Sequence, residues 1–226
     1  MTYDGIVVDY GHGGVIDGQY QTAGKQYTFT DYSEYWVGEG VVNRKSAVYL
    51  IRYALEAGVR VWDAVAQKEW LVAPKTWMDL EQQDTPLSTR VAFANGGERR
   101  KAVYLSLHSN AIGDSSVGSS LSARGVSFYT SIGQTGSDAI ATSLYSSFLG
   151  IVSPSIPIRS GDWSDGDIDQ EANFYVLRNT ASAAILGEVG FFTNITDARF
   201  LDGVFGPQRI GRAYLSGVLP FLSGSV

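Results

Sequence analysis

The sequence predicts an α/β fold, a single domain with a twisted, mainly parallel central sheet flanked by helices. Three observations predict it. Short apolar runs rich in Val and Ile alternate with segments whose apolar residues recur at helical spacing, an order typical of parallel sheets. The length of 226 residues suits one domain. Hydrophobic residues make up 44% of the chain and charged residues 18%, which is enough apolar surface for a sizeable core.

The chain begins with a predicted strand and a long loop. Residues 5–9 are a short apolar run closed by a glycine-rich turn at residues 11–14, which indicates a buried strand. Residues 15–37 are aromatic and polar and show no helical period. We therefore expect a long loop there, with a short strand near residues 25–30.

A helix and a second strand follow. From about Gly40 the apolar residues fall on one stripe at helical spacing. The members of this stripe are Val41, Val48, Ile51 and Leu55. The helix is expected to stop at Gly58, because glycine is the usual residue just after a helix end. Residues 59–62 then form a strand, which completes a strand–helix–strand unit.

The second half of the chain repeats this alternation. Its apolar runs are separated by irregular or Gly-, Ser-, Pro- and Asp-rich stretches at residues 63–86, 110–122 and 150–173. The expected elements are a helix over residues 87–95, strands over 102–107 and 125–130, a helix over 137–149, a strand over 183–187 and a helix over 206–219. This order completes the α/β pattern.

Charge and composition exclude several classes of function. The chain has 17 Lys and Arg against 23 Asp and Glu, so it lacks the basic surface that nucleic-acid binding requires. No apolar run approaches the ~18 residues of a membrane helix, so we expect no membrane insertion. The absence of cysteine excludes disulfides and Cys-based zinc or redox motifs. Histidine is scarce, with only two residues.

The first residues show no targeting signal. Residues 1–4 carry no basic group, and the apolar stretch at residues 6–8 is too short for the core of a signal peptide. We therefore expect cytoplasmic synthesis without a signal peptide.

Both histidines are placed at strand ends. His12 and His108 each follow an apolar strand, and Glu188 follows a third. Because the carboxyl ends of parallel strands meet at one edge of a sheet, where ligands bind, these side chains are expected to gather in space. The sequence therefore predicts a functional site at this edge.

Two neutral imidazoles and a carboxylate suit a catalytic zinc ion, which keeps one position open. The third ligand has to be an acidic residue near the same edge. Glu39 is the best placed, since it opens the helix after the first strand and loop, and Asn43 on the same face could hydrogen-bond its carboxylate. Glu34, Asp17 and Asp9 are weaker candidates by position.

Each of these residues also has a purely structural interpretation. His12 could bond the backbone of its loop, His108 could be a buried histidine with satisfied hydrogen bonds, and Glu39 could be a solvated residue of a first helical turn. Glu188 differs, because a carboxylate buried at a strand end is costly unless it is paired. Together the four residues favour a metal site, but they do not identify a substrate.

Five segments resemble a known family when they are read in order. They are residues 6–14 (IVVDYGHGG), 39–44 (EGVVNR), 87–95 (LSTRVAFAN), 105–111 (LSLHSNA) and 185–194 (ILGEVGFFTN). In these segments the sequence resembles the zinc-dependent N-acetylmuramoyl-L-alanine amidases of the type 3 family. Those enzymes cut peptidoglycan between the lactyl group of muramic acid and the first L-Ala of the stem peptide.

The resemblance implies a ligand set and a mechanism. One zinc ion per chain would be held by His12, Glu39 and His108, and Glu188 would be the catalytic carboxylate. Zinc would polarise the amide carbonyl while Glu188 moves a proton from water to the leaving amine. Asn110, two residues after His108, is expected to bind the substrate peptide.

The sequence departs from the family pattern at three places. Tyr10 stands where proline is usual before Gly-His, and Ser109 stands where alanine is usual. The loop between His12 and Glu39 is longer than in the simplest members, so the alignment of Glu39 carries the greatest risk.

The resemblance also leads to expectations about the whole protein. Residues 1–226 are expected to form a single catalytic amidase domain without a separate wall-binding module, similar to a phage-type lysin (endolysin) that reaches the bacterial cell wall after release. Two alternatives stay open. One is another zinc peptidase that cuts within the stem peptide, and the other is a non-catalytic peptidoglycan-binding domain, against which the full Glu188 motif argues.

Two further segments are discounted as sites. Residues 162–169 are acidic but lack the alternation and the bidentate glutamate of a calcium loop, so a solvated loop is expected, in which Trp163 could contact glycan or peptide. The aromatic residues 27–36 are expected to pack within their loop rather than form a sugar platform.

Overall fold

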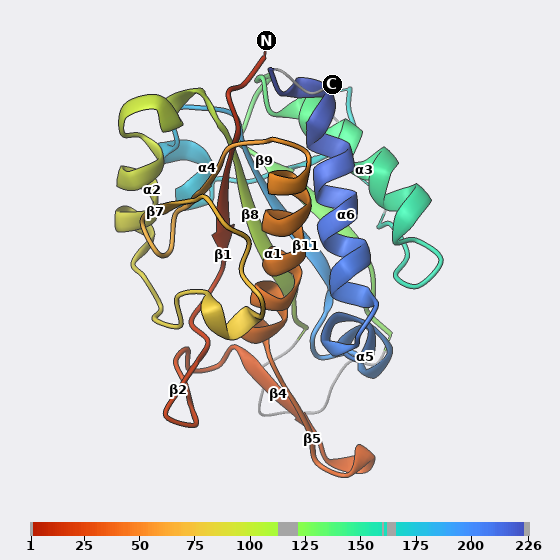
Figure 1. The fold of residues 1–226 in the computed structure, drawn as a ribbon. Coiled ribbons are helices and arrows are strands. Elements are labelled where there is room, and N and C mark those ends of the chain that lie inside the picture. Colours follow the sequence, from red (N-terminus) through yellow and green to blue (C-terminus); the bar gives the residue numbers. More distant parts are fainter. Residues whose placement is uncertain (1, 113–121, 160, 162–165, 224–226) are drawn as a thin grey trace.

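The computed structural model describes residues 2–112, 122–159, 161 and 166–223 and is built around one large sheet (Figure 1). In this part of the chain the sheet has seven strands. From edge to edge they are β10 (Gln170–Glu171), β9 (Val126–Thr130), β11 (Ala184–Phe191), β8 (Val103–Asn110), β1 (Ile6–Tyr10), β6 (Val61–Asp63) and β7 (Lys68–Trp70). The predicted α/β domain with a central sheet is therefore confirmed.

The four central strands are parallel. β11 pairs with β8, β8 with β1 and β1 with β6, so their carboxyl ends reach the same edge of the sheet. The three strands nearer the margins are reversed, since β9 is antiparallel to β11, β10 is parallel to β9, and β7 is antiparallel to β6. The sheet is mainly parallel as predicted, while the direction of β9 depends on the path of its connections and not on its own residues.

Helices cover both faces of the sheet (Figure 1). One face packs against α1 (Glu39–Glu56), α3 (Asp138–Ile151), α5 (Ile195–Asp202) and α6 (Gly206–Val218), and the other against α2 (Leu87–Ala94) and α4 (Tyr175–Asn179). Short 3-10 helices lie at Thr30–Tyr32, Trp77–Asp79, Gly97–Lys101 and Leu219–Phe221. Within the described residues, no helix is both long and apolar enough to cross a membrane.

The helix α1 begins and ends close to the predicted positions. Glu39 is its first residue, one position before the predicted start. Gly58, two residues past the last helical residue, has a φ of +73°, the left-handed conformation that glycine adopts at little cost. The helix packs on α6 and on β8, and this packing fixes its first turn over the carboxyl edge of the sheet.

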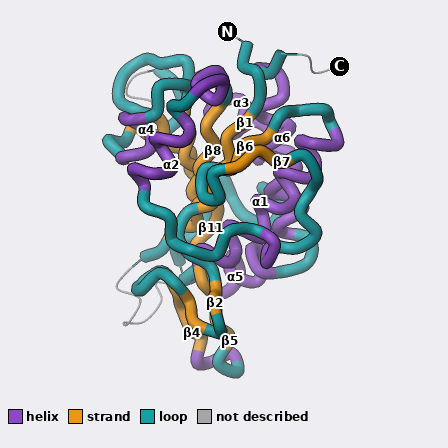
Figure 2. Tube along the Cα trace, turned by 60° about the vertical axis from the view of Figure 1, so that its left-hand side comes forward, coloured by secondary structure: helices purple, strands orange, loops and turns teal. Residues whose placement is uncertain are grey.

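The segment between β1 and α1 is more ordered than predicted. The short strand expected near residues 25–30 is present as β4 (Gln26–Phe29), but it pairs with β5 (Tyr35–Gly38) in a hairpin. A smaller hairpin, β2 (Val15–Ile16) with β3 (Gln19–Tyr20), precedes it. Figures 1 and 2 show both hairpins at the same end of the molecule, beyond the carboxyl edge of the central strands. This end is where the candidate residues were expected.

A buried ion pair joins β1 to α2. Alternate residues of β1 face opposite sides of the sheet, and Asp9 faces the side that α2 covers. Arg90 of α2 donates from Nη1 to Oδ1 of Asp9 at 2.7 Å, while Tyr104 and Ser106 donate to Oδ2. Burial alone would raise the pKa of Asp9, but the charge of Arg90 and these hydrogen bonds hold the pKa below its usual value.

Arg90→Met is expected to lower the free energy of unfolding by about 3–5 kcal/mol, because it leaves the Asp9 carboxylate buried without a counter-charge. Urea unfolding of the metal-free protein measures this loss. Arg60→Met is the matched control, since Arg60 is exposed and pairs with Glu69 and Glu98 on the surface. A loss for Arg90→Met as small as that of the control would show that the fold does not depend on the buried pair.

Candidate active site

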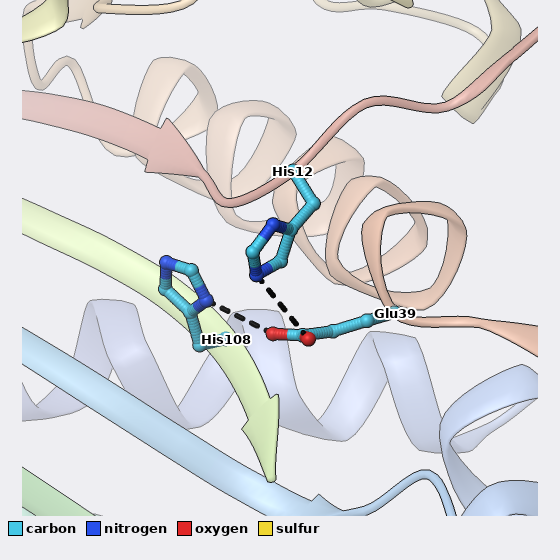
Figure 3. A group of neighbouring side chains, drawn as sticks. All are labelled: His12, Glu39 and His108. Carbon is cyan, nitrogen blue, oxygen red and sulfur yellow. Dashed lines mark hydrogen bonds and ion pairs between the residues drawn. The ribbon is translucent and has the colours of Figure 1, made fainter. Parts of the chain in front are cut away.

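Three side chains converge at the carboxyl edge of the sheet (Figure 3). Nδ1 of His108 lies 2.9 Å from Oε1 of Glu39, and Nε2 of His12 lies 3.3 Å from Oε2 of the same carboxylate. One ligand atom from each residue falls within 4.8 Å of the other two. The structure therefore brings together the two histidines and the acidic residue that the sequence favoured.

His12 lies in the turn after β1, where its backbone is in the left-handed region with a φ of 67°. Arg44, buried on α1, holds this turn, since its Nη1 donates to the carbonyl oxygens of His12 and Gly40 at 2.8 Å each. Gly11 has to be glycine because a Cβ there would lie 2.0 Å from Cε1 of His108. The turn thus places the imidazole ring of His12 next to that of His108, with the ring centroids 5.0 Å apart.

Glu39 is buried at the start of α1, with a side chain that is 1% exposed. Burial raises its pKa, but the hydrogen bond from His108 and the charges of both histidines outweigh this effect and hold the pKa well below the usual value. Within the described residues, Oε2 of Glu39 accepts no hydrogen bond of good geometry. A buried carboxylate oxygen left in this way is suited to a cation.

His108 lies within β8 rather than just beyond the strand, because β8 continues to Asn110. Burial lowers the pKa of His108, but the hydrogen bond and charge of Glu39 raise it above its ordinary value. The backbone N–H of the next residue, Ser109, also donates to Oε1 of Glu39, at 3.3 Å. The strand therefore positions both the imidazole and the carboxylate beside it.

Asn43 does not hold the carboxylate of Glu39, contrary to the prediction. Its Nδ2 donates to the carbonyl oxygen of Gly11 at 3.2 Å, and its Oδ1 accepts from Oγ of Ser109 at 3.1 Å. Asn43 thereby ties α1 to the segments on either side of the site. The serine that stands where the family usually has alanine supplies one of these two hydrogen bonds.

Glu188 lies directly opposite His108 in the parallel pairing of β11 with β8. Its Oε2 is buried, without a hydrogen-bond partner among the described residues. Burial raises the pKa of Glu188 to about 7, with His108 lowering it and Glu39 raising it. A carboxyl with this pKa can take up or release a proton near neutral pH, as general acid–base catalysis requires.

The raised pKa of Glu188 implies a pH-dependent stability of the metal-free protein. The carboxyl ionises near pH 4.5 when unfolded and near 7 when folded, so the folded state loses stability as pH rises through this window. A shift of this size corresponds to a loss on the order of 3 kcal/mol. Glu188→Gln should remove it, which makes the metal-free variant more stable than the wild type at pH 8 but not at pH 4. Urea unfolding in the presence of a chelator measures the free energy of unfolding of both proteins at pH 8 and pH 4. The same difference between variant and wild type at both pH values would contradict the prediction.

The donor set of the three clustered residues fits a metal ion. Two imidazole nitrogens and one carboxylate oxygen are typical ligands of a catalytic zinc site that keeps a position open. Among the described residues, His12, Glu39 and His108 are the group of three that could hold a metal ion. The buried Oε2 of Glu39, which has only the longer contacts with His12 and Lys25 among the described residues, supports the same interpretation.

The weaker candidates for the third ligand lie elsewhere. The carboxylate of Asp9 pairs with Arg90 on the face of the sheet that α2 covers. Asp17 and Glu34 lie at the turns of the two hairpins, with φ values of 49° and 56°. None of these three acidic residues belongs to the cluster formed by the described residues.

Other predicted residues are only partly described. Asn110 closes β8 and its Oδ1 accepts from the backbone N–H of Ala111 at 2.7 Å, so its role in substrate binding stays a prediction. Trp163 and most of the loop over residues 110–122 lie outside the described residues. In the aromatic segment, residues such as Phe29 pack into the core as expected, whereas Tyr32 and Trp36 are exposed.

Two residues near the site were missed by the sequence reasoning. Arg44 falls on the apolar stripe of its helix, three residues after Val41 and four before Val48. A charge on such a stripe is a signal of a buried cation. Nζ of Lys25 lies 3.5 Å from Oε2 of Glu39. No local sequence pattern predicts this contact, because it depends on how the β4–β5 hairpin folds back against the start of α1.

The comparisons with known proteins agree with this geometry. The sequence model of the N-acetylmuramoyl-L-alanine amidases matches residues 6–219. The chain belongs to this family. The match spans the cluster and Glu188, and membership supports N-acetylmuramoyl-L-alanine amidase activity on peptidoglycan. No curated protein sequence matches this amidase.

Solved structures share the fold of this amidase. The catalytic domain of CwlV, an N-acetylmuramoyl-L-alanine amidase from Bacillus (Paenibacillus) polymyxa var. colistinus, is 21% identical with a TM-score of 0.67, and the match covers 98% of each chain. An N-acetylmuramoyl-L-alanine amidase from Clostridium difficile 630 is 22% identical with a TM-score of 0.68 over 100% of this chain and 99% of that one. The catalytic domain of the CD27L endolysin targeting Clostridia difficile is 18% identical, with a TM-score of 0.61 over 97% and 99%.

Proposed function

We propose that this amidase is zinc-dependent and hydrolyses the amide bond between muramic acid and L-Ala of peptidoglycan, with one zinc ion held by His12, Glu39 and His108. The observation that carries the proposal is the convergence of these three side chains around the buried Oε2 of Glu39, which accepts no hydrogen bond of good geometry from the described residues. Zinc in such a site polarises carbonyl groups and makes water more acidic.

We assign the proton transfers to Glu188. Its Oε2 is buried, the residue lies opposite His108, and its carboxyl has a pKa of about 7. In the deprotonated form it accepts a proton from the attacking water. After the water oxygen has bonded to the carbonyl carbon, Glu188 donates this proton to the nitrogen of L-Ala as the C–N bond breaks, which leaves the carboxyl group of muramic acid and a free peptide amine.

Digestion of purified sacculi followed by mass spectrometry tests the proposed bond. Free stem peptides that begin with L-Ala, beside intact glycan strands, are the expected products. Cuts between residues of the stem peptide would show a zinc peptidase instead, and no release of peptide would show a non-catalytic binding domain. Metal analysis of the active protein should find about one zinc per chain, and an active preparation without metal would overturn the zinc assignment.

The biological setting of the activity is a separate proposal. The fold is shared both by the catalytic domain of CwlV and by that of the CD27L endolysin, so the fold alone does not distinguish their roles. We propose a phage-type lysin, made in the cytoplasm and acting on the cell wall after release. Adding the purified protein to living bacteria checks this, since a lysin lowers the turbidity of the culture from outside.

A further inference from the structure

Lys25 lies beside the site, immediately before strand β4 of the larger hairpin. Its backbone is firmly anchored, because its carbonyl oxygen accepts the N–H of Glu39 at 2.8 Å and the hydroxyl of Tyr20 at 2.9 Å. The same Tyr20 hydroxyl accepts the N–H of Gly40 at 2.9 Å. The hairpin is therefore joined to the first turn of α1, and Lys25 cannot move away from the site without breaking these bonds.

The side chain of Lys25 reaches from this anchor toward the cluster. Its Nζ lies 3.5 Å from Oε2 of Glu39, while 43% of the side chain is exposed to solvent. The charge also acts on Glu188, whose pKa it lowers. Lys25 thus places a solvent-accessible ammonium beside Glu39, and its charge also reaches Glu188.

Binding of a metal ion would change the charge that balances the ammonium of Lys25. Glu39 carries one negative charge, and the two histidines bind a metal as neutral imidazoles. When Glu39 holds a divalent cation, the metal neutralises the Glu39 carboxylate, so Glu39 no longer balances the charge of Lys25. An anion that arrives with the substrate would restore the balance.

We infer that Lys25 is a substrate-binding residue that pairs with a free carboxylate of the stem peptide close to the scissile amide. The inference rests on the proposed function, which places that amide next to Glu39 and Glu188. Consecutive Cα atoms lie 3.8 Å apart, so a carboxylate on the second peptide residue is about one residue beyond the bond that is cut. This separation is within reach of the four-carbon stem of lysine. The protein would then favour stem peptides whose second residue is not amidated.

Two substrates that differ in one group test the inference. Muramoyl peptides of L-Ala followed by D-Glu, with a free α-carboxylate, are compared with the same peptides carrying the α-carboxamide. For the wild type, kcat/KM is expected to be on the order of tenfold higher for the free carboxylate. Lys25→Met, which keeps the apolar stem but removes the charge, should cleave both substrates equally, and Lys25→Arg should restore the preference.

A matched control and a second readout separate binding from other effects. Lys101→Met removes an exposed lysine from the opposite end of the sheet and should keep the wild-type preference. In the slow variant Glu188→Gln, calorimetry should show tighter binding of the free carboxylate, and adding Lys25→Met should remove this difference. Zinc affinity measured by competition with a chelator shows whether Lys25→Met acts on the metal instead.

The outcomes are distinct. An unchanged preference in Lys25→Met, or an equal loss for both substrates together with altered zinc affinity, would overturn the role of Lys25 and leave the amidase proposal intact. If the zinc-loaded wild type released no L-Ala peptide from either substrate, the proposed function would be wrong and the assignment of Lys25 would fall with it.

Discussion

Glu188→Gln is expected to lower kcat by about 10²–10⁴-fold while the protein keeps its metal. The reason is that glutamine has nearly the same shape as glutamate but cannot accept the proton of the attacking water. Glu188 lies opposite His108 in the sheet and is not part of the three-residue cluster. The loss should therefore appear in kcat on muropeptides, with zinc content close to that of the wild type.

Glu98→Gln is the control for this experiment, since Glu98 is exposed and pairs with Arg60 far from the site. It should retain full activity. Substantial turnover by Glu188→Gln would mean that another group carries the proton. Loss of zinc from Glu188→Gln would instead place Glu188 among the ligands.

Glu39→Ala is expected to weaken zinc binding by more than about 100-fold, because loss of a direct ligand should exceed the 10–100-fold cost of losing an outer-shell partner. The same holds for His12→Ala and His108→Ala, since the chain has no further histidine to take their place. Activity should fall in parallel and recover only in part when zinc is added in excess. Chelator competition measures the affinity directly.

Glu34→Ala is the matched control for Glu39→Ala. Glu34 is exposed at the turn of the β4–β5 hairpin and was one of the three alternative ligands by position in the sequence. Its removal should leave zinc affinity unchanged. If Glu34→Ala lost the metal and Glu39→Ala kept it, the hairpin would have to fold over the site in the loaded protein, and the ligand assignment would change.

Most of the central fold could be predicted because its signals are local. The apolar runs that became β1, β8 and β11 are buried on both faces, so they read as continuous hydrophobic stretches, and α1 shows its stripe at helical spacing. The two hairpins between β1 and α1 could not be predicted, because their strands are short and mostly half-exposed and have little apolar alternation. The reversed direction of β9 could not be predicted from the sequence either, because strand direction depends on the pairing partners and not on the composition of the strand.

The candidate site also has a part that local sequence patterns predict and a part that they do not. Strand order predicted that both histidines and Glu188 lie at one edge of a parallel sheet, because each follows or ends an apolar run whose direction the α/β alternation sets. Which carboxylate joins the histidines depends on long-range packing. Asp9, Asp17, Glu34 and Glu39 are all near enough along the chain, but the packing of α1 against β8 brings Glu39 alone of these four to His108. The contact of Lys25 with Glu39 also depends on tertiary structure, because the folded hairpin and not the sequence spacing sets the distance between the two residues.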